Sequence, residues 1–172
     1  VNLIGALPWT GTDTKSDFSG TGEANDRWNL IGDRVDFNKF GHFDSVPCFG
    51  ITGSKFGADS ACTTVAIPSG TGLTAAQKVV NMPSECIAAA TALGTNPSVP
   101  SSDASATGLG ALAGFGCYKS GSSVIVPPAQ GTFGNMGRNI FRGAGLRLWD
   151  ISLRKTTRFT EGLSAEFQFD MY

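Results

Sequence analysis

The C-terminal segment from Leu146 to Tyr172 alternates between apolar and polar residues along most of its length. Alternation with a period of two places successive side chains on opposite faces of a β-strand, so this segment predicts two amphipathic strands joined by a short turn. The second strand carries on its apolar face Leu163, Ala165, Phe167, Phe169 and Met171, and on its polar face Ser164, Glu166, Gln168, Asp170 and Tyr172. The first strand has an apolar face, interrupted by Arg147, of Trp149, Ile151 and Leu153, and a polar face of Asp150, Ser152 and Arg154.

The polar faces of this predicted hairpin carry carboxylates, glutamine and arginine, opposite large apolar and aromatic side chains. Two such faces are typical of a strand that separates lipid from a water-filled lumen in an outer-membrane barrel. The alternation also fits an ordinary antiparallel hairpin whose apolar face packs on the core of a soluble protein. The pattern alone therefore leaves both environments open.

Length and composition favour a single domain built from strands, turns and long loops. The chain has 172 residues, of which 23 are glycine and 8 are proline, and both residue types are poor helix formers. Charged residues make up 16% of the chain and the net charge is −1, so binding to nucleic acid has little support. No run approaches the roughly 18 apolar residues that a membrane-spanning helix needs.

Four cysteines lie in the middle of the chain and indicate disulfide bonds. There is no Cys-x-x-Cys pair, and His42 is the sole histidine, which argues against structural zinc and against a thioredoxin-like redox site. An even number of cysteines in a loop-rich segment fits an oxidising compartment. We predict the sequential pairing Cys48–Cys62 and Cys86–Cys117 because it closes the two shortest non-overlapping loops. Four free buried thiols are the alternative.

Two short helices are expected in this cysteine-bearing region. Thr74 is a candidate N-cap for a helix over residues 75–82, which Pro83 would end. Ser84 is a candidate N-cap for a second helix over residues 85–93, and the glycine that follows is its expected C-terminal stop.

The remaining segments predict little regular structure. Arg27–Phe37 is a candidate strand with an interruption at Gly32. Residues 95–114 are rich in Ser, Gly, Ala and Pro, a composition that predicts a mobile surface loop. The whole stretch 38–120 is therefore expected to be one long insertion that has no core of its own.

No catalytic or metal-binding pattern stands out. His42 lies beside Asp44, but the sequence has no Gly-x-Ser-x-Gly motif to position a nucleophile. Four carboxylates in a Gly- and Thr-rich loop follow no standard calcium-binding spacing; they are Asp13, Asp17, Glu23 and Asp26. We therefore predict that the chain is not an enzyme and has no catalytic, cofactor or metal site.

The C-terminal third resembles a known family. The elements that carry the resemblance are a Gly-Arg-Asn motif, a Trp-Asp-x-Ser-Leu strand, a Thr-Glu turn and a final alternating strand, found here at Gly137–Asn139, Trp149–Leu153, Thr160–Glu161 and Leu163–Tyr172. At this spacing they resemble the C-terminal barrel region of TonB-dependent receptor-like outer-membrane proteins, in particular the Oar-like group. The early segments Gly5–Trp9 and Asp17–Asn29 also resemble this group.

The resemblance implies a mainly β fold, with antiparallel strands of a partial outer-membrane-type barrel or sheet and a long disulfide-pinned loop that contains short helices. In this interpretation residues 1–37 supply strands and a polar loop of the barrel-like region. Residues 38–120 form the loop insertion with the disulfides, and residues 121–172 supply the C-terminal barrel-like strands.

The same resemblance assigns an environment to each face of the predicted hairpin. The side chains expected to face the membrane or a partner are Trp149, Ile151, Leu153, Leu163, Phe167, Phe169 and Met171. Those expected to face the lumen, where they could pair with one another, are Asp150, Arg154, Glu166, Gln168 and Asp170.

Two functions of different class follow as expectations. In the first, the chain is part of an outer-membrane receptor or transporter of the TonB-dependent kind, located in the bacterial outer membrane, whose extracellular loop helps to select the ligand. Its partners would be the rest of the barrel, a plug domain and outer-membrane lipid. In the second, it is an extracellular structural or assembly protein whose open strand edges pair with neighbouring copies.

Two departures from the family pattern suggest that the chain is a fragment of a larger protein. Receptors of this kind close a barrel of about 22 strands around a plug, and the strands expected here are far fewer. Tyr172 also shares the polar parity of Asp170, whereas such barrels usually end on an aromatic residue of the lipid-facing parity. We therefore expect the isolated chain to aggregate or to form a strand-paired oligomer in water.

Overall fold

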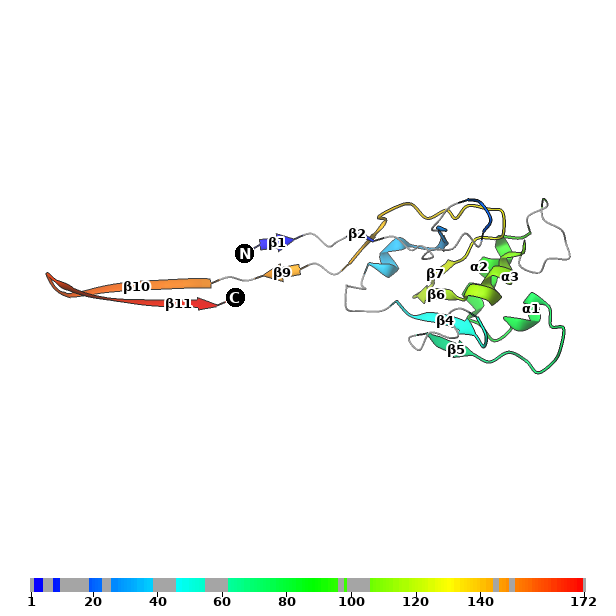
Figure 1. Ribbon diagram of the computed structural model, residues 1–172, viewed down its shortest axis with the longest axis horizontal. Coiled ribbons are helices and arrows are strands. Elements are labelled where there is room, and N and C mark those ends of the chain that lie inside the picture. The colour runs from blue at the N-terminus through cyan, green and yellow to red at the C-terminus, as the bar shows by residue number, and fades with distance from the viewer. Residues whose placement is uncertain are drawn as a thin grey trace.

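The computed structural model consists of a compact unit and a long β-hairpin that extends away from it (Figure 1). None of the helices in the described part of the chain combines the length and apolar character needed to cross a bilayer. The structure describes residues 2–4, 8–9, 19–22, 26–38, 46–54, 62–95, 98, 106–143, 146–148 and 151–171.

The hairpin is formed by β10 (Ile151–Thr160) and β11 (Leu163–Met171), joined by a turn at residues 161–162. The strands are antiparallel and pair Ile151 with Met171 at the end nearer the compact unit. The hairpin predicted from the alternating sequence is thus confirmed, and with it the mainly antiparallel β character of the chain.

A two-stranded stem connects the hairpin to the compact unit. β1 (Asn2–Ile4) pairs with β9 (Leu146–Leu148), and β2 (Pro8–Trp9) pairs with β8 (Phe141–Arg142), both in antiparallel fashion. β9 lies in line with β10 in Figure 1. The chain therefore enters and leaves the compact unit along the same narrow stem, and the unit is an insertion between two antiparallel strands.

The compact unit is built on a five-stranded sheet with the order β3-β7-β6-β4-β5, in which β4 and β5 are parallel and the other neighbours are antiparallel. Its strands are β3 (Asn29–Ile31), β4 (Cys48–Ile51), β5 (Thr63–Val65), β6 (Cys117–Ser120) and β7 (Ser123–Val126). The edge strand β3 and the strand β7 come from either side of the stretch 38–120. The sheet therefore joins this stretch to the chain segments that flank it.

Among its described residues, the compact unit also contains three α-helices and a 3₁₀ helix: η1 (Arg34–Phe37), α1 (Ala75–Lys78), α2 (Ser84–Ala92) and α3 (Gly108–Phe115). Of the predicted strand over 27–37, the β3 portion forms a strand and the last four residues form η1, because the chain turns at Gly32 with a φ of 107°. A side chain at this glycine would overlap Ser123 on β7.

The predicted cap of α1 is confirmed, and that of α2 is wrong. Thr74 and Gln77 form a reciprocal capping box at the start of α1, although this helix ends at Lys78 instead of reaching residue 82. Pro83 is the N-cap of α2, and Ser84 is its first helical residue. The Ser84 hydroxyl donates to the Glu85 carboxylate at 3.2 Å instead of capping the backbone.

The prediction that residues 95–114 form a surface loop is wrong for residues 108–114, because α3 begins at Gly108; residues 96–97 and 99–105 lie outside the described residues. The Thr107 hydroxyl caps this helix by accepting the Gly110 N–H at 2.8 Å. Ala111 and Leu112 are buried and α3 packs on α2. Small side chains let the two helices approach closely, so a composition typical of loops here forms part of the core.

The expectation that the insertion lacks a core is also wrong. Between the sheet and the helices lies one cluster of buried residues, consisting of Ile51, Val79, Met82, Cys86, Ala89, Ala90, Leu112, Cys117, Val124 and Val126. A second cluster consists of Trp28, Phe37, Ile125, Met136 and Phe141. Both clusters combine residues that are distant in sequence, which explains why local patterns did not reveal them.

Both predicted disulfides are present. Cys48–Cys62 links β4 to the segment before β5, and Cys86–Cys117 links α2 to β6, with Cα–Cα distances of 4.8 and 6.3 Å. Next to the second bridge, the Lys119 ammonium lies 2.7 Å from the Glu85 carboxylate. This hydrogen-bonded contact with Lys119 lowers the pKa of Glu85.

We expect the substitution of glycine by alanine to change the free energy of unfolding differently at two positions in α3. A Cβ at Gly108 would overlap the Ala90 carbonyl oxygen, whereas a Cβ at Gly114 would meet nothing within 4 Å. We expect Gly108→Ala to lower the free energy of unfolding by about 1–3 kcal/mol. Gly114→Ala should leave it unchanged or raise it by up to about 1 kcal/mol through helix propensity.

Urea unfolding of the two variants checks this prediction of close α2–α3 packing. Equal stability of Gly108→Ala and Gly114→Ala would contradict it.

Candidate functional site: the two-faced hairpin

The apolar face of the hairpin brings side chains of both strands side by side. Leu153 lies opposite Phe169, and Ile151 lies opposite Met171. Strand pairing therefore joins two rows of the predicted membrane- or partner-facing residues into one surface. Trp149, which was assigned to the same surface, lies outside the described residues.

This apolar surface is not covered by the compact unit. Every described residue of β10 and β11 is exposed, and Phe167 and Leu163 have exposed fractions of 63% and 61%. Soluble monomers rarely expose a contiguous apolar patch of large side chains. The surface is therefore suited to contact with lipid or with an apolar partner, and not to water.

The opposite face holds a network of polar side chains. The Ser152 hydroxyl donates to Asp170 Oδ1 at 2.6 Å, and the Gln168 amide donates to Asp170 Oδ2 at 2.8 Å. Arg154 forms an ion pair with Glu166. The structure thus brings together the described residues predicted to face the lumen. Asp150 lies outside the described residues.

Two residues of β10 were not singled out from the sequence. Lys155 lies opposite Phe167 and interrupts the apolar row with a positive charge. Phe159, with an exposed fraction of 65%, lies at a β-bulge between Arg158 and Thr160, next to the turn. Both residues lie an even number of positions after Leu153. Continuing the alternation from Leu153 along the chain would therefore have placed them on the apolar face.

The residues of the Gly- and Thr-rich loop that carries the four carboxylates are only partly described. Asp26 is buried, and its two carboxylate oxygens accept hydrogen bonds from the Ser19 hydroxyl at 2.6 Å and the Ser19 N–H at 3.0 Å. Asp13, Asp17 and Glu23 lie outside the described residues, as do His42 and Asp44. Across the part of the chain that the structure describes, no group of three or more His, Cys, Asp or Glu side chains is placed to hold a metal ion.

The lengths of the two strands indicate the class of protein to which the hairpin belongs. β10 and β11 contain 10 and 9 residues, and a strand that crosses the hydrocarbon core of an outer membrane needs about 9–11. With one apolar and one polar face, the hairpin has the dimensions and the alternation of two transmembrane barrel strands.

The family comparison agrees with this class. Residues 60–172, about two thirds of the chain, match the family model described as an outer membrane beta barrel domain. The chain belongs to this family and is an outer-membrane protein. The comparisons with curated proteins and with solved structures found no match.

Proposed function

We propose that the chain is part of an outer-membrane receptor or transporter of the TonB-dependent kind. In this proposal β10 and β11 are strands of the barrel wall, and the compact unit is an extracellular loop domain that helps to select the ligand. The observation that carries the proposal is the position of the compact unit as an insertion between antiparallel strands, at the end of the hairpin opposite its turn.

The lengths of the two connections support an orientation. Outer-membrane barrels have short turns on the periplasmic side and longer loops outside the cell. The turn at residues 161–162 is short, and the connection from β1 to β9 contains the whole compact unit. The turn is therefore assigned to the periplasm and the compact unit to the cell exterior.

The disulfides of the compact unit also support its assignment to the cell exterior. Two disulfides hold β4 and α2 to neighbouring segments of the sheet. Disulfides persist outside the cytoplasm, and a crosslinked unit would keep a ligand-selecting surface in a fixed shape.

Active uptake rests on the resemblance of the Gly137–Asn139 and Trp149–Leu153 segments to TonB-dependent receptors. That resemblance adds a plug domain, the remaining barrel strands and an inner-membrane partner that supplies energy. Solute entry would then stop when the inner-membrane proton gradient is dissipated. Catalysis has no part in this proposal.

A second candidate function is an extracellular assembly protein. Among the described residues β11 pairs with β10 alone, so its outer edge offers backbone donors and acceptors to another strand. An open edge of this kind recruits partner strands. In this alternative the strand would come from a neighbouring copy and not from the same barrel.

The proposed orientation predicts which parts of the protein can be reached on intact cells. An epitope inserted between Gly70 and Thr71, in an exposed turn of the compact unit, should bind antibody without permeabilisation. The same epitope inserted between Glu161 and Gly162 should bind only after the outer membrane is opened. Flow cytometry measures both, and surface labelling of the 161–162 epitope would overturn the orientation.

The native product separates the receptor from the assembly protein. An antibody against the compact unit should detect a polypeptide of many hundred residues, including a plug, in the outer-membrane fraction. A short discrete polypeptide recovered from outside the cell would favour the assembly protein.

A further inference from the structure

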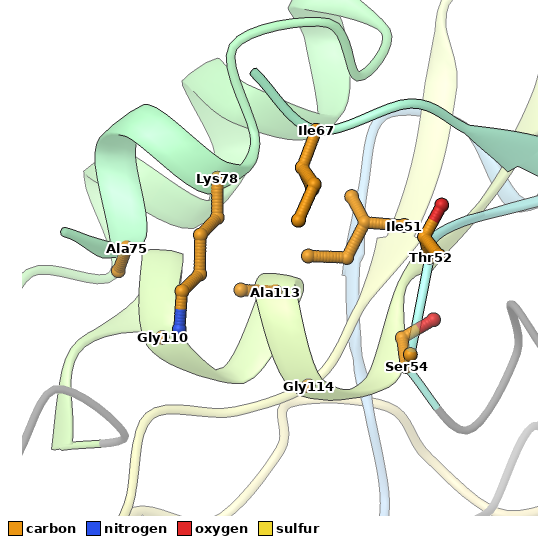
Figure 2. Close-up of a pocket in the computed structure, with 10 residues that line it drawn as sticks. Ile51, Thr52, Ser54, Ile67, Ala75, Lys78, Gly110, Ala113 and Gly114 are labelled. Atoms are coloured by element: carbon orange, nitrogen blue, oxygen red, sulfur yellow. The ribbon is translucent and has the colours of Figure 1, made fainter. Parts of the chain in front are cut away.

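The compact unit contains a hollow of about 430 Å³ at one edge of the sheet, between β4, α1 and α3 (Figure 2). This volume lies within the range of about 300–1,000 Å³ that is usual for small-molecule sites. The described residues that line it are Ile51, Thr52, Gly53, Ser54, Ile67, Ala75, Lys78, Gly110, Ala113 and Gly114.

The hollow exists because one face of α3 lacks side chains. Gly110 and Gly114 lie one turn apart on this helix, and a Cβ added at Gly114 would meet nothing within 4 Å. Glycine is unfavourable within a helix. The two glycines therefore lower the stability of α3 at the positions that line the hollow.

The walls are held in place by hydrogen bonds. The turn after β4 closes through the Ser54 N–H, which donates to the Ile51 carbonyl at 3.0 Å. On the opposite side the Asn81 amide donates to the Ala66 carbonyl at 2.9 Å and fixes the segment that carries Ile67. These two hydrogen bonds hold the turn after β4 and the segment that carries Ile67 in place.

The lining has an apolar centre with polar groups on both sides. Ile51 and Ile67 point toward one another near Ala113 in Figure 2, and the Lys78 side chain extends its ammonium toward Gly110. The hydroxyls of Thr52 and Ser54 lie on the far side of Ile51. No aspartate or glutamate belongs to the described lining, so the charge at the site is positive.

We propose that this hollow binds a small organic anion, namely a carboxylate on a short aliphatic body. The carboxylate would accept hydrogen bonds from the Lys78 ammonium, and the aliphatic body would cover Ile51, Ile67 and Ala113. The described lining offers no aromatic ring on which a sugar or a base would stack. This site depends on the compact unit alone and not on the transport activity proposed above.

Hexanoate is the probe that tests this proposal. The whole protein, reconstituted in lipid nanodiscs so that detergent does not compete, is titrated with hexanoate, hexanol and hexylamine by saturation-transfer NMR. Hexanoate should bind saturably, hexanol about twofold to fivefold more weakly, and hexylamine more weakly still, because an exposed ion pair adds only a modest free energy to that of the apolar contact.

Three variants locate the binding. Lys78→Met keeps the aliphatic stem and should weaken hexanoate binding about twofold to fivefold without changing hexanol binding. Arg34→Gln removes one positive charge from η1, which does not line the hollow, and should bind hexanoate like the unaltered protein. Gly114→Leu fills the hollow with a good helix former and should abolish saturable binding while circular dichroism stays unchanged.

The proposal is overturned by any of three results. The first is that hexanoate fails to saturate on the unaltered protein. The second is that Lys78→Met and Arg34→Gln weaken hexanoate binding equally, which would indicate an effect of net charge. The third is that Gly114→Leu, folded by circular dichroism, binds hexanoate as before, which would place binding elsewhere, including in the lipid.

Discussion

Phe169→Asp is expected to reduce insertion of the protein into the outer membrane at least tenfold. Phe169 lies in the apolar row of β11, opposite Leu153, with 48% of its surface exposed. Transferring a phenylalanine side chain out of an apolar environment costs about 1.5–3 kcal/mol, and 1.4 kcal/mol corresponds to a factor of ten. The new carboxylate adds a further cost if it faces lipid. The heat-resistant, protease-protected fraction in purified outer membranes measures the effect.

Gln168→Glu is the matched control on the polar face. Gln168 lies opposite Arg154 in the strand register and donates to Asp170. A glutamate there loses this hydrogen bond and repels Asp170, but it gains an attraction to Arg154, so the two effects largely offset each other. We expect insertion close to that of the unaltered protein. Equal damage from Phe169→Asp and Gln168→Glu would mean that the two faces have been assigned to the wrong environments.

The hairpin could be predicted from the sequence because its structure is encoded locally. In β11, period-two alternation from Leu163 to Met171 fixes which side chains share a face. A slip of one residue would move every apolar side chain to the polar face. The short turn at 161–162 then sets which residues meet across the strands, including the pairing of the Arg154 and Glu166 side chains.

The compact unit was less predictable because its order depends on contacts that are distant in sequence. Asn29 on β3 pairs with Val126 on β7, and nothing local to either strand specifies that partner. In α3, the stretch of Gly, Ala and Leu becomes a buried helix because Gly108 lies against the Ala90 carbonyl. On composition alone, the same small residues favour a loop.

The candidate sites also divide into one that local sequence predicts and one that depends on contacts between distant residues. The residues of the polar face were predicted as a group because, along each of the two strands, the polar and charged side chains fall on alternate positions. The hollow beside α1 was not predicted, because Ile51, Lys78 and Gly114 come from three separate elements. A glycine in a helix interior is the one local signal that could have pointed to it.

Removing the Cys86–Cys117 bridge is expected to destabilise the compact unit by about 4 kcal/mol. The bridge closes a loop of 31 residues, for which the lost constraint on the unfolded chain corresponds to about 3.7 kcal/mol. Both cysteines are also fully buried in the cluster between sheet and helices, so Cys86→Ala with Cys117→Ala leaves small cavities as well. Urea unfolding followed by tryptophan fluorescence, to which Trp28 in the second cluster contributes, measures the loss.

The double variant Cys48→Ala with Cys62→Ala is the matched comparison and should cost about 3 kcal/mol, because its loop has 14 residues. Its cysteines lie nearer the surface, with exposed fractions of 7% and 9%, so the cavity contribution is smaller. If this pair cost as much as Cys86–Cys117 or more, the contact of α2 with β6 would not be the main covalent support of the core. The buried position of Cys86 and Cys117 would then have to be explained by packing alone.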